Sequence, residues 1–289
     1  MYSYKKTNLP KKTIEIELTI PWADIEKKYD ESFEALRKEL KTEGFRQGKA
    51  PKKIAESKIS RDKVYDHLIR KIIPEIYTEI VKKEDIKPII SPKIELTKAK
   101  EKEEWVIKLK TAETPDVVLG NYKEKAKKAS SEVKKSDIWV PGKDKEISKE
   151  EKEKQDRMIF QAKLDAVLGE AKAEVSDLIV EDEVNSRLSK LVDDISKVGL
   201  TMDAYLSSKN LTKEKLNEMI RKEIEDTYRL EFVLQKIADE EKIKIEEAEL
   251  KKLFESFKTE KEKETAQKNL YYYASLMRKQ KTLDYINSL

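Results

Sequence analysis

The stretch EGFRQGKAP at residues 43–51 brings together residue types that suit binding to a partner molecule. An aromatic ring such as that of Phe45 can fill a pocket on a partner surface. The cations of Arg46 and Lys49 can form charge-assisted hydrogen bonds with carboxylates or phosphates. The two glycines allow the backbone to turn, and the proline suits the first turn of a following helix. We therefore predict a binding loop at residues 43–51, made by Gly44, Phe45, Arg46, Gly48, Lys49 and Pro51.

The charge around the binding loop fits this prediction. Residues 41–63 contain eight cations and three carboxylates, although the whole chain carries a net charge of +4. A basic tip of this kind attracts RNA phosphates or an acidic protein surface. Charge alone is more typical of a solvated turn. Phe45 favours a binding role, because a phenylalanine between two glycines has little local core to join.

The sequence offers little for catalysis. Its single histidine, His67, falls beside the apolar stripe of an expected helix, and one histidine cannot build a metal site. The chain has no cysteine, no glycine-rich phosphate loop and no pair of carboxylates that stands out as a general acid and base. We therefore expect no catalytic site, no metal and no cofactor.

The binding loop is expected to lie between two long helices in an α+β region. Residues 13–20 alternate apolar and polar side chains, which predicts a strand. Apolar residues three and four positions apart predict helices over residues 22–41 and 61–83. Two further strands are predicted over residues 87–98 and 104–112. This order favours an N-terminal antiparallel sheet with long helices on one side.

The chain is expected to divide into three parts. Residues 1–113 form the α+β domain, and residues 114–147 mix prolines, glycines, serines and lysines in a pattern that predicts a linker. Residues 148–289 predict an all-α, multi-helix domain with arms, closed by helices over residues 246–257 and 261–286. Charged residues make up 42% of the chain and hydrophobic residues 38%, which favours an elongated molecule.

The location of the protein is also suggested by its composition. No apolar run is long enough to cross a membrane, and residues 1–9 lack the apolar core of a secretory signal. The lack of cysteine means that the chain forms no disulfides. We therefore expect a cytoplasmic protein with no membrane partner.

The loop GFRQGKAP resembles the signature of trigger factor, a family of ribosome-associated bacterial chaperones. The family's loop has the form Gly-Phe-Arg-x-Gly-Lys-x-Pro, and Gln47 stands here where lysine is usual. The order of strands and helices around the loop is similar too, and the resemblance covers most of residues 1–113 and 148–289. Other stretches that resemble the family are residues 114–123, 173–188, 199–216 and 237–250.

The resemblance implies an ATP-independent molecular chaperone. Residues 1–113 would dock on the large ribosomal subunit near the exit tunnel, against ribosomal protein and ribosomal RNA, with Phe45, Arg46 and Lys49 carrying the contact. The helical domain would shield unfolded nascent polypeptides, and the free protein could form a homodimer. The family's FK506-binding-protein-type isomerase domain has no counterpart, because residues 114–147 are too short and too polar to form one. We therefore expect no peptidyl-prolyl isomerase activity.

Contacts with unfolded clients are expected from apolar and aromatic residues that helical periodicity leaves off the core. Three consecutive tyrosines at residues 271–273 cannot all face one core, and methionine side chains adapt to varied partners. A third or more of the residues chosen in this way are expected to be ordinary core residues. The full set is Met202, Tyr205, Phe254, Phe257, Tyr271, Tyr272, Tyr273 and Met277.

Three other hypotheses stay open. A basic RNA-binding protein could use residues 41–63 with the lysine-rich residues 123–135, although the sequence has no known reading motif and no aromatic stacking pairs. A helical holdase chaperone could act without the ribosome. A prolyl isomerase would require that residues 114–147 belong to an enzyme domain, and an isomerisation assay would reveal it.

Overall fold

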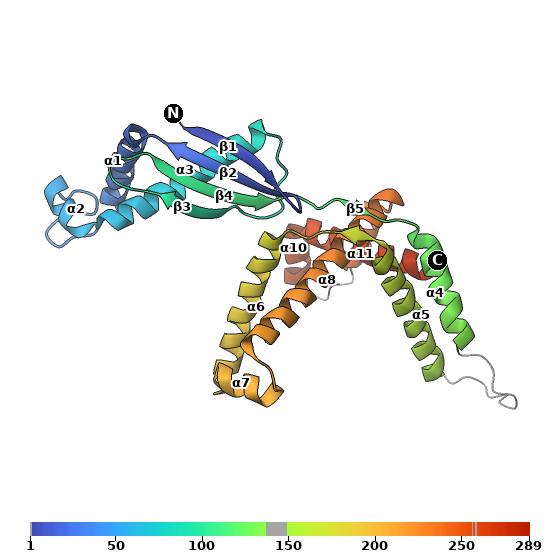
Figure 1. Cartoon of the computed structure of the whole chain (residues 1–289). Coiled ribbons are helices and arrows are strands. Elements are labelled where there is room, and N and C mark those ends of the chain that lie inside the picture. Colours follow the sequence, from blue (N-terminus) through green and yellow to red (C-terminus); the bar gives the residue numbers. More distant parts are fainter. Residues whose placement is uncertain (1, 137–148, 256, 258) are drawn as a thin grey trace, which may run out of the picture. The chain divides into compact units, whose positions relative to one another are not determined.

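The structure is a computed structural model that describes residues 2–136, 149–255, 257 and 259–289. The chain separates into two compact units, Met1–Thr114 and Pro115–Leu289. The first unit is the predicted α+β region and the second is mostly helical (Figure 1). The fold class predicted from the sequence is therefore confirmed.

A four-stranded antiparallel sheet forms one layer of the first unit, with strand order β1-β2-β4-β3. On β2 the alternate residues from Ile14 to Ile20 are buried, as the alternation predicts. The N-terminal strand was missed by the sequence analysis, because it is a lysine-containing edge strand with no buried side chain among its seven residues. The strands are β1 (Ser3–Leu9), β2 (Thr13–Ile20), β3 (Lys93–Lys98) and β4 (Trp105–Ala112).

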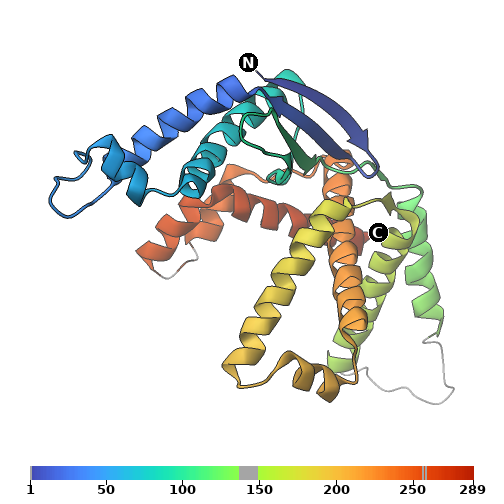
Figure 2. The same cartoon turned by 60° about the vertical axis from the view of Figure 1, so that its left-hand side comes forward.

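Two long helices supply the other layer of the first unit. They are α1 (Trp22–Glu39) and α3 (Arg61–Lys83), with the short α2 (Lys52–Lys58) between them. Isoleucines and leucines of α1 and α3 pack on the inner face of β2 and β4 to form the main core. Figures 1 and 2 show α2 and the binding loop at the end of the α1–α3 pair that is remote from the sheet.

The second unit contains two pairs of long helices that extend from a shared base. Helices α6 and α8 lie side by side and α7 joins their far ends, while α4 packs along α5 (Figures 1 and 2). The base is closed by a short ladder between β5 and β6 and by α11 against α8. The elements are β5 (Val117–Val118), α4 (Tyr122–Ser136), α5 (Lys149–Glu170), β6 (Lys172–Ala173), α6 (Asp177–Lys197), α7 (Met202–Lys209), α8 (Lys213–Glu240), α9 (Glu247–Glu255), α10 (Glu260–Lys268) and α11 (Leu270–Ser288).

Two segments of the second unit differ from the sequence-based expectation. Residues 122–136 form helix α4 within the predicted linker, because Leu119, Tyr122 and Ala126 are buried in a core shared with α5, α8 and α11. Residues 137–148 of the predicted linker lie outside the described residues. The expected single helix over residues 261–286 is two helices that meet at Asn269.

Candidate functional site

The binding loop is built from two consecutive turns. In the first, the Phe45 N–H donates to the Thr42 carbonyl (3.2 Å), and in the second the Lys49 N–H donates to the Arg46 carbonyl (2.9 Å). Each turn has a glycine as its third residue. Gly44 has φ +81° and Gly48 has φ +77°. A four-residue turn with positive φ at the third position favours glycine there, which explains the spacing of the two glycines.

The second turn is fastened to the end of α1. The Gly48 N–H donates to the Leu40 carbonyl (3.2 Å), and the Gln47 side-chain amide donates to the Glu39 carbonyl (3.4 Å). A Cβ atom at Gly48 would lie 2.6 Å from the carbonyl oxygen of Lys38, so the close approach also requires glycine. The loop therefore has a defined backbone even though it projects from the helices.

Between the two turns the chain presents the predicted binding side chains. Phe45 is 41% exposed, which is high for a large apolar residue, and Arg46 and Lys49 are exposed beside it. Ala50 is buried, and Pro51 (φ −57°) is the N-cap residue immediately before α2, not a residue of its first turn as the sequence predicted. The structure thus brings all six predicted loop residues together on one short projection.

A small apolar cluster lies between α1, α2 and the start of α3, next to the binding loop. Phe33 of α1, Ala55 of α2, and Ile59 and Val64 around the start of α3 are buried together, separately from the core under the sheet. The Lys52 ammonium lies 5.8 Å from the centroid of the Phe33 ring, within the range of a cation–π interaction. This cluster fixes the ends of the two long helices and so sets the position of the loop.

The aromatic residues predicted to contact unfolded chains separate into two groups. Tyr271 and Tyr272, at the start of α11, are 92% and 65% exposed, and the Tyr272 ring also meets the Tyr273 ring edge-on at 5.4 Å. Phe254, Phe257 and Tyr273 instead pack together with ring centroids 5.7, 5.8 and 6.3 Å apart. Phe254 is buried. This second group therefore holds α9 and the segment after it against α11.

The three remaining predicted residues are half-buried. Met202 and Tyr205 lie on α7 at the far end of the α6–α8 pair, and Met277 lies on α11. Val198 follows the last residue of α6 and is exposed. Gly199 comes next with φ +75° and ends the helix. Exposed apolar residues missed by the sequence analysis are Val192 on α6, Met219 on α8 and Leu200 between α6 and α7.

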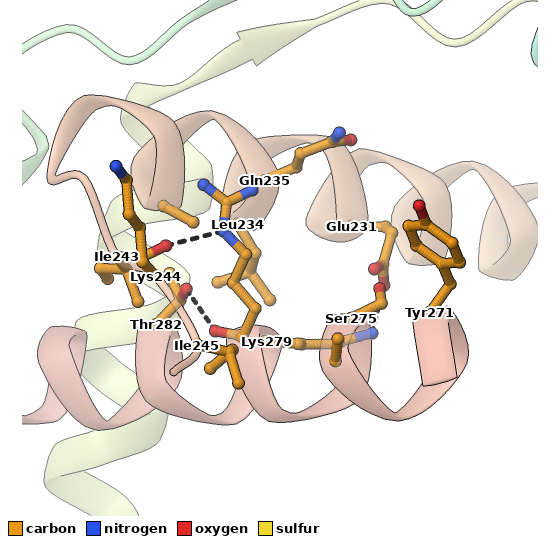
Figure 3. Close-up of a pocket in the computed structure, with 13 residues that line it drawn as sticks. Glu231, Leu234, Gln235, Ile243, Lys244, Ile245, Tyr271, Ser275, Lys279 and Thr282 are labelled. Carbon is orange, nitrogen blue, oxygen red and sulfur yellow. Dashed lines mark hydrogen bonds and ion pairs between the residues drawn. The ribbon is translucent and has the colours of Figure 1, made fainter. Parts of the chain in front are cut away.

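A groove of about 540 Å³ lies between α8, α11 and residues 243–245. Figure 3 shows Ile243, Ile245 and Leu234 toward one end of this groove and Tyr271 at the other. The Arg278 guanidinium crosses it, donating to the Ile243 carbonyl (2.8 Å) and pairing with Asp239 (2.6 Å). Lys279 and Glu231 form a second ion pair along it. The groove therefore combines apolar side chains with two ion pairs.

A polar network anchors α4 to this part of the second unit. Tyr122 Oη donates to Glu241 (2.8 Å), and the Lys123 ammonium pairs with the same carboxylate (2.7 Å). The hydrogen bond from Lys123, together with the one from Tyr122, holds the pKa of Glu241 below its ordinary value. Burial, followed by the bond to Glu241, raises the pKa of Tyr122 well above its ordinary range. These shifts have structural causes and do not indicate a catalytic group.

The described part of the chain holds no cluster of three or more histidine, cysteine, aspartate or glutamate side chains that could bind a metal ion. Among the same residues, no helix combines the length and apolar character that a membrane span requires. His67 lies half-buried on α3, and its Nδ1 has no hydrogen-bond partner. The geometry described above thus offers surfaces for binding.

Two family profiles together match almost the whole chain. The family profile "Bacterial trigger factor protein (TF)" matches residues 2–147, and the profile "Bacterial trigger factor protein (TF) C-terminus" matches residues 144–287. The two matches adjoin, and no isomerase domain is found between them.

Relatives with the name trigger factor align with parts of the chain. The protein from Mycolicibacterium smegmatis is 34% identical over 106 residues, covering 37% of this chain and 23% of the relative. The protein from Limosilactobacillus reuteri is 33% identical over 159 residues, covering 55% of this chain and 34% of the relative. The chain therefore aligns with about a third or less of the length of these curated relatives.

A solved structure shares the fold along its whole length. It is described as "Promiscuous Substrate Recognition in Folding and Assembly Activities of the Trigger Factor Chaperone" and aligns with a TM-score of 0.65 over 99% of both chains. The sequence identity is 15%, so this likeness concerns the fold.

Proposed function

The chain belongs to the bacterial trigger factor family, and on that premise we propose that it is an ATP-independent chaperone that docks at the ribosomal exit tunnel and shields nascent polypeptides in the cytoplasm. The observation that carries this proposal is the exposure of Phe45 between two glycine turns, with Arg46 and Lys49 beside it. A defined loop that projects an apolar ring and two cations is suited to a pocket lined by anionic groups.

Docking would combine burial of one apolar side chain with hydrogen bonds from two cations. Burial of the exposed Phe45 ring against the large subunit would stabilise the complex. Arg46 and Lys49 add charge-assisted hydrogen bonds to carboxylates of a ribosomal protein or phosphates of ribosomal RNA. The two turns hold these groups in place before contact, so little conformational entropy is lost on binding.

Client binding is assigned to the second unit. Its exposed apolar side chains lie along the α6–α8 pair and at the start of α11, where Tyr271 leads into the groove between α8 and α11. Burial of such apolar surface against an unfolded chain stabilises the complex and does not depend on a particular client sequence. Release follows when folding buries the same client residues in the client's own core, so the cycle needs no ATP.

We infer that the chain lacks peptidyl-prolyl isomerase activity. The two family profiles adjoin, and the described residues of this region form α4 and the start of α5. A proline-peptide isomerisation assay tests this inference, and turnover well above the uncatalysed rate would contradict it.

Co-sedimentation with purified bacterial ribosomes tests the docking proposal. The variant Phe45→Ala/Arg46→Ala/Lys49→Ala should remain in the supernatant, whereas the unmodified protein pellets. The matched control is Lys53→Ala/Lys58→Ala, which removes the same number of cations from the neighbouring α2 and should still pellet. Circular dichroism confirms that each variant is folded.

The outcomes separate this proposal from its alternatives. If both variants lose binding equally, the contact is diffuse charge and the docking role of the loop is wrong. Competition by naked RNA as strong as that by ribosomes would favour an RNA-binding protein. If the unmodified protein prevents aggregation of a client but never pellets with ribosomes, it is a ribosome-independent holdase.

A further inference from the structure

One edge of the sheet in the first unit carries apolar side chains that nothing in that unit covers. Strand β3 lies at this edge, next to β4 (Figure 1). In the register of the pair, Ile94 lies opposite Leu109 and Leu96 opposite Ile107. Directly opposed residues of an antiparallel pair share a face, so all four side chains lie on the face that packs on the helices.

The burial of these four residues differs sharply between the two strands. Leu109 and Ile107 are fully buried in the main core, whereas Ile94 is 44% exposed and Leu96 is 46% exposed. Ile89, just before the strand, is exposed as well. Edge strands of soluble proteins are normally protected by charges, prolines or a covering element, because their free backbone groups can pair with another chain. Strand β3 has lysines at both ends and a bulge before Lys98, but between them its inward-facing positions continue the apolar core to the edge.

We propose that the β3 edge binds an extended segment of an unfolded polypeptide by strand addition, so that the client becomes a fifth strand of the sheet. The backbone groups of residues 94–96 would form the ladder, and Ile94 and Leu96 would pack against alternate apolar side chains of the client. The bulge between Leu96 and Lys98 ends the regular ladder. A client segment of about five residues matches this length. The proposal rests on the proposed chaperone function and adds a site in the first unit to those in the second.

The charges of β3 favour an unfolded segment over a second copy of the chain. Antiparallel pairing of two β3 strands with Ile94 opposite Leu96 would place the two Glu95 carboxylates directly opposite each other. Like charges in that position are destabilising. Pairing with Ile94 opposite Ile94 would instead set Leu96 against Pro92, which has no N–H to donate to the ladder. An unfolded client carries many short segments of alternating polarity, and those with a basic residue opposite Glu95 complement the strand.

The same charge argument specifies a probe. On the outer face Glu95 pairs with Lys110 of β4 at 3.6 Å, so a client lysine opposite Glu95 would extend an existing ladder of charges. The peptide TTVKVTT places its lysine opposite Glu95 and its valines opposite Ile94 and Leu96. Its counterpart TTVEVTT places a glutamate there instead.

Binding of fluorescein-labelled TTVKVTT to the full chain, without ribosomes, tests the proposal. We expect Ile94→Lys/Leu96→Lys to weaken binding by on the order of tenfold, since it replaces two apolar contacts with cations. The matched control is Leu9→Lys, at the 36% exposed end of the opposite edge strand β1, and it should bind as the unmodified chain does. Glu95→Lys should reverse the preference, so that TTVEVTT binds better than TTVKVTT.

Strand addition has a further signature that a simple apolar contact lacks. N-methylation of alternate peptide residues removes the N–H groups of one edge while keeping the side chains, and it should abolish binding. NMR resonances of amides 93–98 should shift on addition of the unmodified peptide. Equal binding of the methylated peptide, or unchanged affinity in Ile94→Lys/Leu96→Lys, would overturn the proposal.

The remaining outcomes also decide the matter. Amides of β3 that bond to β4 are protected from exchange in any case, so the informative amides are those that point away from β4. If these outward-pointing amides are protected without peptide and lose protection on dilution, a second copy covers the edge and the proposal is wrong. If they are protected at every concentration, another part of the same chain covers the edge and the proposal is also wrong. Because these measurements use no ribosomes and leave the binding loop intact, their failure does not affect the docking proposal.

Discussion

The position at which a Gly48 side chain would begin lies 2.6 Å from the carbonyl oxygen of Lys38, in the last turn of α1. The second turn of the binding loop is therefore pressed against the end of the preceding helix. The first turn is different, because a Cβ atom at Gly44 would meet nothing within 4 Å. Gly44 is thus needed for its backbone conformation alone, whereas Gly48 is needed for both conformation and space.

This difference predicts unequal effects of two conservative substitutions. Gly44→Ala forces an L-residue into the left-handed region, which costs about 1–2 kcal/mol. Gly48→Ala adds a clash with backbone that cannot be relieved by a side-chain rotation, so we expect a larger loss of unfolding free energy and weaker ribosome binding. Urea denaturation and ribosome co-sedimentation measure the two effects. Equal losses in the two variants would show that the contact with α1 is unimportant.

Two phenylalanines of the loop region should show opposite behaviour. Phe33 is buried in the cluster that supports the binding loop, and truncation of a buried phenylalanine costs about 3–5 kcal/mol. Phe33→Ala should therefore lower the thermal midpoint substantially. Phe45 is exposed, so Phe45→Ala should leave the midpoint almost unchanged and reduce ribosome affinity. A large loss of stability in Phe45→Ala would mean that its ring belongs to the core.

The fold of the first unit follows the sequence closely where one face of an element is buried. The alternation at Ile14–Ile20 and the helical stripes of α1 and α3 gave the correct element types. The edge strand β1 could not be predicted in the same way, because none of its residues is buried. Its place depends on the ladder with β2, which is a tertiary contact.

The second unit shows a related limit. Helix α4 has a highly polar sequence whose few buried residues, such as Ala126, find partners on α5, α8 and α11 only after folding. The groove between α8 and α11 likewise depends on how distant segments meet. The projecting loop with its two glycine turns was predicted from sequence, because local turn chemistry forms it without long-range contacts, whereas the binding role of its six residues stays a prediction. The aromatic residues near α11 were identified as a set, but their division into exposed and packed members required the structure.

The exposed tyrosines of α11 provide a test of client binding. Tyr271→Ser/Tyr272→Ser removes two exposed rings and should weaken suppression of the aggregation of an unfolded client, since apolar area available for burial is lost. Its unfolding free energy should change by less than about 1 kcal/mol, as for other surface substitutions. The contrasting variant Phe254→Ala disrupts the packed aromatic cluster and should lower stability. Unchanged suppression in the tyrosine variant would remove these residues from the client surface.

The network of Glu241 with Tyr122 and Lys123 predicts a defined dependence of stability on pH. The folded-state pKa of Glu241 is depressed, so its contribution is complete above the ordinary value of 4.5 and is lost as the pH falls through the folded-state pKa. Glu241→Gln keeps an acceptor for the Tyr122 hydroxyl and removes the charge that pairs with Lys123. At neutral pH we expect the variant to be less stable by about 1 kcal/mol, because the pair is partly exposed to solvent.

The decisive quantity is the difference in unfolding free energy between the unmodified protein and Glu241→Gln, measured by urea denaturation from pH 7 to pH 3. Other carboxylates titrate in both proteins and cancel in this difference. We expect the difference to stay constant down to about pH 4.5 and then to shrink, because protonation of Glu241 in the unmodified protein removes the same charge that the substitution removes. A difference that is as large at pH 3 as at pH 7 would mean that the glutamine acts through packing, and that α4 is not held to the base of the second unit by this charge.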